Sequence, residues 1–124
     1  ILECGEAGLC DDLIISEYVE GDSHNKAIEL FNPSDVTIDL TSYTMELYNN
    51  GATEPNQELN LTGSLLPGET YVIGNSQATP ALQNLSDITS QLTWYNGNDA
   101  LVLSKNGEAK MSTENWITGV LWIE

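Results

Sequence analysis

The sequence contains no Arg and only three Lys against 19 acidic residues, which gives a formal net charge of −16. Proteins bind nucleic acid largely through Lys and Arg side chains that displace counterions from the phosphates. A chain with so few of them is poorly suited to that contact, and we expect no direct nucleic-acid partner. The same acidity disfavours an anionic membrane surface, whereas it favours solubility and the attraction of divalent cations.

Long apolar runs are also missing, and no stretch approaches the length needed to cross a bilayer, so we expect no membrane insertion. The chain begins with Ile1 and has no basic-then-apolar leader, which suggests a processed protein or an excised domain. The hydrophobic share of 40% is spread over 124 residues in short runs, and it suffices for one core. We expect a single domain that is monomeric in isolation and requires no cofactor.

Cysteine is scarce as well, because Cys4 and Cys10 are the only two in the chain. Gly5 and Gly8 lie between them, and a flexible loop of this length can close into a disulfide. A pair of free thiols is the alternative, and a zinc site is disfavoured because no His or Cys stands at ligand spacing. The disulfide interpretation favours an oxidising compartment, outside the cell or at its surface.

The apolar residues that are present alternate with polar ones over short distances, which is the period of a β-strand. Asn96-Gly97 between two apolar runs predicts a β-hairpin, and residues 75–90 predict a long crossover with room for one helical turn. The last apolar run, 116–123, is either a closing strand or a tail. Strands are predicted at residues 13–20, 27–32, 36–40, 43–48, 58–62, 71–73, 92–95 and 100–104.

These patterns predict an all-β fold, because no amphipathic segment of helical period is longer than two turns. We expect a β-sandwich of about seven to nine mainly antiparallel strands. The predicted organisation is an N-terminal segment with the cysteine pair at 1–12, the sandwich domain at 13–111 and a C-terminal strand or tail at 112–124.

Several segments of the chain carry a recognisable pattern. Residues 15–33 contain Ile-Ser-Glu-Tyr-Val-Glu-Gly, a loop ending in Asn-Lys, and Ala-Ile-Glu-Leu-Phe-Asn-Pro, which is similar to the opening signature of the lamin tail domains found in bacteria. Residues 39–43, 65–73 and 96–103 follow in the family's order. The resemblance covers residues 12–110 and implies an immunoglobulin-like sandwich.

The resemblance also implies a function. Bacterial lamin tail domains occur on secreted or surface proteins, so we expect a non-catalytic interaction or anchoring module located outside the cell or at its surface, with a protein or glycan partner. One alternative is an accessory domain of an extracellular hydrolase such as a nuclease or phosphatase. Another is a calcium-dependent carbohydrate-binding module.

Catalysis is not expected, because the single His has no accompanying nucleophile arrangement and no phosphate-binding loop occurs. Candidates for ligand contact are aromatic or cationic residues near the predicted turns. For the aromatic residues core packing is the alternative, and for the His and the Lys it is a solvated side chain and a cross-strand pair with a carboxylate. The candidates are Tyr18, His24, Lys26, Trp94 and Tyr95.

Two turns are rich in the oxygen ligands that calcium prefers. We therefore consider calcium as a cofactor that the chain could bind without requiring it. The alternative is that Asn and Asp simply serve the turns in which they stand. The candidate ligands are Glu20, Asp22 and Asn25 in the first turn, and Asn96, Asn98 and Asp99 in the second.

Overall fold

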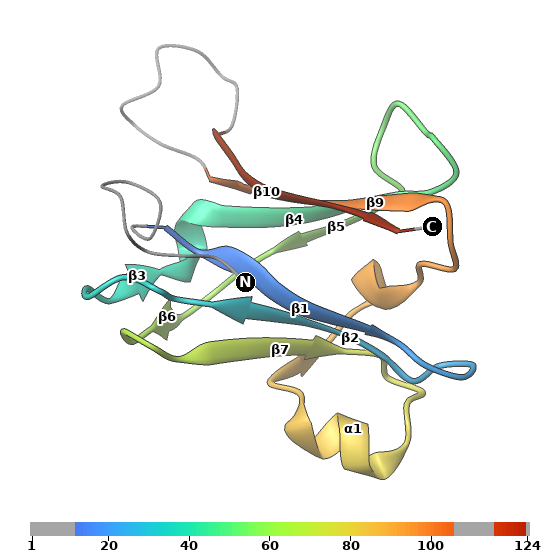
Figure 1. Ribbon diagram of the computed structural model, residues 1–124, viewed down its shortest axis with the longest axis horizontal. Helices are drawn as coiled ribbons and strands as arrows, with labels where there is room; N and C mark the ends of the chain where they lie inside the picture. The colour runs from blue at the N-terminus through green and yellow to red at the C-terminus, as the bar shows by residue number, and fades with distance from the viewer. Residues whose placement is uncertain (1–11, 106–115, 124) are drawn as a thin grey trace.

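A computed structural model describes residues 12–105 and 116–123 of the chain. In these residues the chain folds into two four-stranded sheets and one pair of two-residue strands. Figure 1 shows the two larger sheets as two layers, with the short helix α1 below the lower one. The prediction of an all-β, mainly antiparallel sandwich is confirmed.

The first sheet has the strand order β1-β2-β7-β8, in which only the β7 and β8 neighbours run parallel. The second sheet has the order β10-β9-β4-β5 and is antiparallel throughout, and β3 pairs with β6 separately. The strands are β1 (Ile14–Glu20), β2 (Lys26–Phe31), β3 (Ile38–Asp39), β4 (Tyr43–Tyr48), β5 (Gln57–Asn60), β6 (Ser64–Leu65), β7 (Thr70–Gly74), β8 (Ile88–Thr89), β9 (Asp99–Lys105) and β10 (Trp116–Ile123).

Side chains from the inner faces of both sheets form one hydrophobic core. Ile28 and Leu30 of β2 meet Met45 and Leu47 of β4 there, and all four are fully buried. Glu29, which lies between the two β2 residues, is on the opposite face, because successive side chains of a strand alternate. Each fully buried aliphatic side chain contributes about 1.5–3 kcal/mol, so this alternation is what drives the two layers together.

β1 and β2 correspond to the strands predicted at residues 13–20 and 27–32, and they pair antiparallel as a hairpin. The chain reverses over residues 21–25, where the Gly21 amide donates to the Asn25 carbonyl oxygen at 2.8 Å. Ser23 adopts a φ of 57°, the left-handed conformation that tight turns require. A bulge interrupts the pairing between Ile15 and Glu17.

The strand predicted at residues 92–95 is wrong, because this segment begins with the short 3₁₀ helix η2 (Gln91–Thr93). The hydroxyl oxygen of Ser90 accepts a hydrogen bond from the Leu92 amide at 3.0 Å and so caps this turn. The hairpin predicted at Asn96-Gly97 is wrong for the same reason. The turn there leads from η2 into β9, so only one of its two flanks is a strand.

The strand predicted at residues 36–40 is also shorter than expected. Only β3 is paired, and the 3₁₀ helix η1 (Leu40–Ser42) follows it directly. The carboxylate of Asp39 accepts hydrogen bonds from the Thr41 amide at 3.0 Å and from its hydroxyl at 2.6 Å, which closes the turn and ends the strand.

The crossover predicted at residues 75–90 contains one short helix, α1 (Pro80–Leu85), as expected. Pro80 occupies its start, where a residue without an amide hydrogen is tolerated. This helix packs against β7 on the outer side of the first sheet (Figure 1). No helix in the described part of the chain is long and apolar enough to span a membrane.

Residues 116–123 form the strand β10, so of the two interpretations of the C-terminal region the strand is the one observed. β10 pairs antiparallel with β9 and lies beside β1 of the other sheet. It therefore closes one side of the sandwich where the two layers meet.

Candidate functional site

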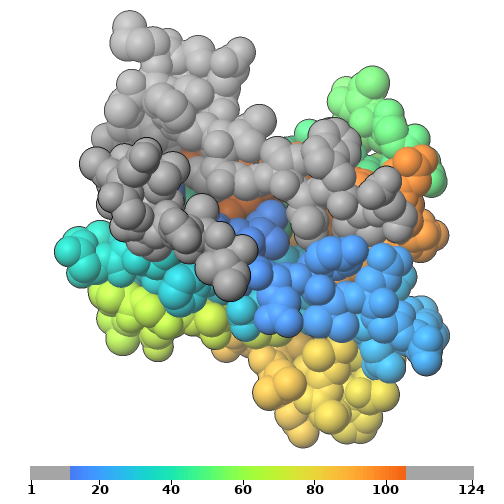
Figure 2. Space-filling model, viewed as in Figure 1, coloured from blue at the N-terminus to red at the C-terminus, as the bar shows by residue number. Residues whose placement is uncertain are grey.

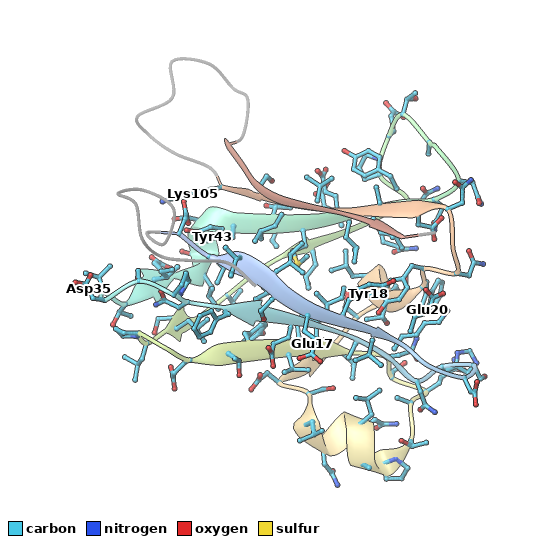
Figure 3. The ribbon with its side chains drawn as sticks, viewed as in Figure 1. Glu17, Tyr18, Glu20, Asp35, Tyr43 and Lys105 are labelled. Carbon is cyan, nitrogen blue, oxygen red and sulfur yellow. The ribbon has the colours of Figure 1, made fainter. Side chains whose placement is uncertain are left out.

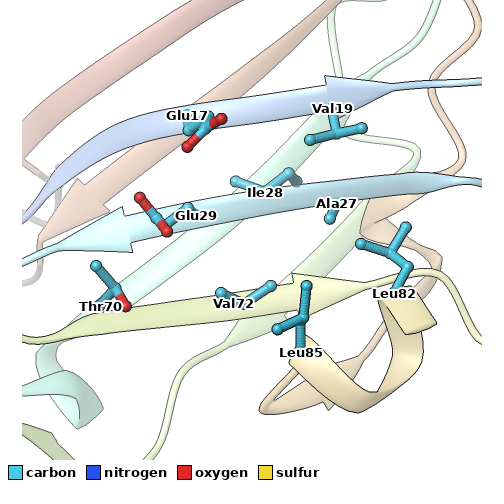
Figure 4. A pocket seen from close by; sticks show the side chains of 9 residues that line it. All are labelled: Glu17, Val19, Ala27, Ile28, Glu29, Thr70, Val72, Leu82 and Leu85. Carbon is cyan, nitrogen blue, oxygen red and sulfur yellow. The ribbon is translucent and has the colours of Figure 1, made fainter.

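A groove of about 340 Å³ crosses the outer face of the first sheet between β1 and α1. Figure 4 shows its apolar side chains gathered at one end and two carboxylates at the other. In Figure 2 the β1 and β2 segments (blue) lie next to α1 (yellow) on the visible surface. The groove is lined by Glu17, Val19, Ala27, Ile28, Glu29, Thr70, Val72, Leu82 and Leu85.

The position of α1, which forms one wall of the groove, depends on Gly74 at the end of β7. A Cβ atom there would lie only 2.0 Å from the Ser86 hydroxyl oxygen, so any side chain would displace the segment that follows α1. The Ser86 hydroxyl donates to the Leu82 carbonyl oxygen at 2.9 Å. At the other end of the helix, the Thr79 amide donates to the side-chain oxygen of Asn25 at 2.9 Å. After the helix, the Asp87 amide donates to the Val72 carbonyl oxygen of β7 at 2.8 Å. One end of the wall is therefore fixed to the β1–β2 loop and the other to the sheet.

The acidic end of the groove consists of Glu17 and Glu29, which lie directly opposite each other on β1 and β2. Two like charges in this arrangement repel and destabilise the pair of strands. The Ser16 hydroxyl donates to the Glu29 carboxylate at 2.8 Å, but neither carboxylate has a cationic partner within the described ranges. The ion pair that the described residues contain joins the Lys105 ammonium group to the Asp12 carboxylate at 3.5 Å. It lies near the start of β1, away from the groove (Figure 3).

Tyr95 is fully buried and belongs to the core between the two sheets. Its hydroxyl oxygen lies 2.6 Å from the Val19 carbonyl oxygen and 3.0 Å from the Ala27 carbonyl oxygen, next to the first hairpin. A side chain without exposed surface cannot contact a ligand, so Tyr95 is not a ligand-binding residue. It packs in the core, which is the alternative given above for the aromatic candidates. It positions the backbone of two residues whose side chains line the groove.

Lys26 and Tyr18 both pack against Tyr95. The Lys26 ammonium group donates to the Tyr95 carbonyl oxygen and lies 5.5 Å from the centre of its ring. Tyr18 meets the same ring edge-on, with 5.9 Å between centroids and an interplanar angle of 77°. Lys26 therefore serves the fold, whereas Tyr18, with 36% of its surface exposed, still reaches solvent.

The pKa of the Tyr95 phenol is raised above its ordinary value, chiefly because burial disfavours the charged form and also because the Glu20 carboxylate repels it. Burial raises the pKa of Tyr43 as well, and its hydrogen bond to Asp12 adds to the effect. Both phenols therefore stay protonated in the folded chain at pH values where an unfolded chain has lost the proton.

These shifts predict that alkaline pH destabilises the fold. Above about pH 10 the unfolded chain releases protons that the folded chain retains at Tyr43 and Tyr95, so stability falls as pH rises. The expected slope is about 1.4 kcal/mol per pH unit for each tyrosine. Urea denaturation across an alkaline pH series measures it.

Tyr95→Phe is the control for this pH dependence. We expect the variant to lose about 1 kcal/mol at neutral pH, because one buried hydrogen bond disappears. It should also show a shallower alkaline slope than the wild-type chain. A wild-type free energy of unfolding that stays constant up to about pH 11 would contradict the prediction.

The other two ligand candidates lie at the surface. Trp94 has 50% of its surface exposed and follows η2. His24 is exposed in the loop between β1 and β2. Their contact with a ligand stays a prediction, as does that of Tyr18.

The calcium candidates do not form a group of acidic side chains. In the described segments no cluster of three or more His, Cys, Asp or Glu residues is placed to hold a metal ion. Asp99 is only 2% exposed, and its carboxylate accepts hydrogen bonds from the Asn49 side chain and from the amides of Asn50 and Asn96, at 2.8, 2.9 and 3.0 Å. Its carboxylate oxygens therefore hold the loop after β4 to the turn before β9.

The other calcium candidates differ in exposure. Glu20, Asp22, Asn96 and Asn98 are exposed, whereas the side-chain oxygen of Asn25 is engaged with α1. Calcium binding by these residues is still a hypothesis. Cys4 and Cys10 lie outside the described residues.

Sequence reasoning missed a polar anchor at Asn32. This side chain is fully buried, and its amide group donates to the carbonyl oxygens of Val36 and Leu65 at 2.8 and 2.9 Å. Its side-chain oxygen accepts from the amide and hydroxyl of Ser34. The signal in the sequence is an Asn placed between a strand and Pro33, where a turn must be held.

Sequence reasoning also missed the groove on the outer face of the first sheet. Two facing sheets around one core, with an apolar groove on the outer face, define an all-β sandwich domain with a surface suited to binding.

A family model described as Lamin Tail Domain matches residues 9–118. The chain belongs to the lamin tail domain family, whose members are immunoglobulin-like interaction domains, and the resemblance noted in the sequence is confirmed. No curated protein matches the chain.

Proposed function

We propose that this chain is a non-catalytic interaction module that anchors or positions a larger secreted or cell-surface protein. Membership of the lamin tail domain family supports the interaction role. The sequence adds that its single His has no nucleophile arrangement around it. A module of this kind acts through a surface that holds a partner and not through a reaction.

The observation that carries this proposal is the apolar groove between β1 and α1. Leu85 keeps 71% of its surface exposed and Val19 keeps 39%, in a chain with a formal net charge of −16. Leaving apolar surface in water costs about 25 cal/mol per Å². Apolar side chains that are exposed together in one groove are typical of a contact surface.

The extracellular location is part of the proposal and is supported by composition. A strongly acidic surface keeps a protein soluble and separate from other copies. The closely spaced Cys4 and Cys10 fit an oxidising compartment. The partner is then a component of the cell surface or of another secreted protein.

A retention assay tests the proposed function. Fluorescently labelled chain is incubated with envelope preparations from the cells that encode it, and the bound fraction is measured against chain concentration. We expect saturable binding that excess unlabelled chain displaces. Binding that never saturates, or label that washes off at every concentration, would contradict the anchoring role. Another acidic protein of similar size is the control for charge alone.

A further inference from the structure

We infer that the groove between β1 and α1 binds an extended segment of a partner protein in which an Arg stands two residues from a Leu, Ile or Val. This inference rests on the proposed function and names the chemistry of the partner. It follows from the charge at one end of the groove, the apolar surface at the other, and the distance between them.

The acidic end of the groove favours binding of a cation. Glu17 and Glu29 face each other across β1 and β2, and their repulsion is relieved when a positive group lies between them. A guanidinium suits this position better than an ammonium, because its planar fork can donate to both carboxylates at once. Glu29 already accepts one hydrogen bond from Ser16, which fixes the orientation of that carboxylate.

The apolar end accepts one aliphatic side chain. Val19 and Ala27 form its floor, and Leu82 and Leu85 of α1 form its wall (Figure 4). An aliphatic group that enters here covers Leu85, the most exposed large apolar side chain among the described residues. The gain is the transfer of both apolar surfaces out of water.

The spacing between the two ends selects an extended partner. Glu17 and Val19 lie two residues apart on β1, which is about 7 Å along a strand. Two side chains on the same face of an extended partner segment have that separation too. An Arg and an aliphatic residue separated by one position therefore reach the carboxylates and the apolar end together.

A second copy of this chain does not fit the groove. The chain contains no Arg, and its formal net charge of −16 makes two copies repel. Of the three Lys, Lys26 and Lys105 are already engaged, by Tyr95 and by Asp12, and Lys110 lies outside the described residues. Charge complementarity therefore points to a basic partner of different sequence.

The first experiment selects the ligand from a displayed library of random peptides, using the whole chain as bait. We expect enriched peptides to carry Arg, or less often Lys, two positions from Leu, Ile or Val. Affinity of one such peptide is then measured by isothermal titration calorimetry. Enriched peptides without a basic residue would overturn the inference.

Paired variants then locate the bound peptide. Glu17→Gln combined with Glu29→Gln should weaken binding roughly tenfold, because both carboxylates that hold the Arg are neutralised. Glu46→Gln combined with Glu58→Gln is the matched control, since these carboxylates also face each other across two strands, β4 and β5, but belong to the other sheet. Equal effects of the two double variants would overturn the inference.

The apolar end has its own variants. Leu85→Glu should weaken binding roughly tenfold or more, because it places a charge in the apolar end of the groove. Val36→Glu is the control, since Val36 is 59% exposed and lies outside the groove. The unfolding midpoint of each variant checks that it folds, which we expect because both side chains are exposed.

A charge exchange completes the test. Glu17→Lys combined with Glu29→Lys should abolish binding of the selected peptide and restore binding when the peptide's Arg is replaced by Glu. Failure of this exchange, or full binding to Leu85→Glu, would overturn the groove assignment while leaving the interaction module intact. Absence of saturable envelope retention by the wild-type chain would instead contradict the proposed function.

Discussion

Replacing Asn32 by Ala should lower the free energy of unfolding by about 3 kcal/mol. The buried amide donates to the carbonyl oxygens of Val36 and Leu65, and its oxygen binds Ser34. Ala can replace none of these bonds, so a buried carbonyl group loses its donor while the turn after β2 loses its support. Urea denaturation followed by circular dichroism measures the loss.

Asn84→Ala is the control for this prediction, because Asn84 is exposed on α1. We expect its stability to stay within about 0.5 kcal/mol of the wild-type value. If Asn32→Ala had an equally small effect, the four hydrogen bonds of that side chain would not be what holds the turn.

The second large effect is expected for Asp99→Ala, with a loss of about 2–3 kcal/mol. The Asp99 carboxylate accepts three hydrogen bonds, two of them from the backbone amides of Asn50 and Asn96. Bonds to a charged acceptor are stronger than neutral ones, and this carboxylate is almost fully buried. Its removal frees the loop after β4 from the turn before β9.

Asp35→Ala removes a carboxylate that is exposed at the far end of the molecule (Figure 3). We expect this control to change stability by less than about 0.5 kcal/mol. Thermal melting of both variants, together with hydrogen exchange at Asn50 and Asn96, distinguishes local loosening from a general effect of charge. Equal melting temperatures for the two variants would contradict the assigned role of Asp99.

Most of the fold can be read from the sequence, because alternation directly reports which side chains enter the core. Ile28 and Leu30 alternate with Glu29, and the structure places them on opposite faces of β2 as this pattern requires. The β4 strand and the crossover helix follow from equally local signals.

The segment around η2 could not be predicted in the same way. Leu92 and Tyr95 are both fully buried, yet they reach the core from a 3₁₀ turn capped by Ser90. Tyr95 is held by carbonyl groups that lie far away in the sequence, at Val19 and Ala27. A local window of sequence contains none of this information.

The groove could not be predicted from local sequence patterns either. It joins residues of β1 to Leu82 and Leu85, which a long stretch of chain separates from them. The segment after α1 packs against Gly74 through Ser86, and this close approach exists only once the chain has folded. The opposition of Glu17 and Glu29 depends on the register after a bulge, and the sequence alone does not fix that register.

The scarcity of basic residues also affects how long the domain survives among digestive enzymes. Trypsin-like proteases cut after Lys or Arg and need the cleaved backbone to be accessible and locally opened. Lys26 and Lys105 lie within the paired strands β2 and β9, and their side chains are engaged with Tyr95 and Asp12. We therefore expect trypsin to cut the folded sandwich slowly at Lys26, because the peptide bond that follows it also lies inside β2.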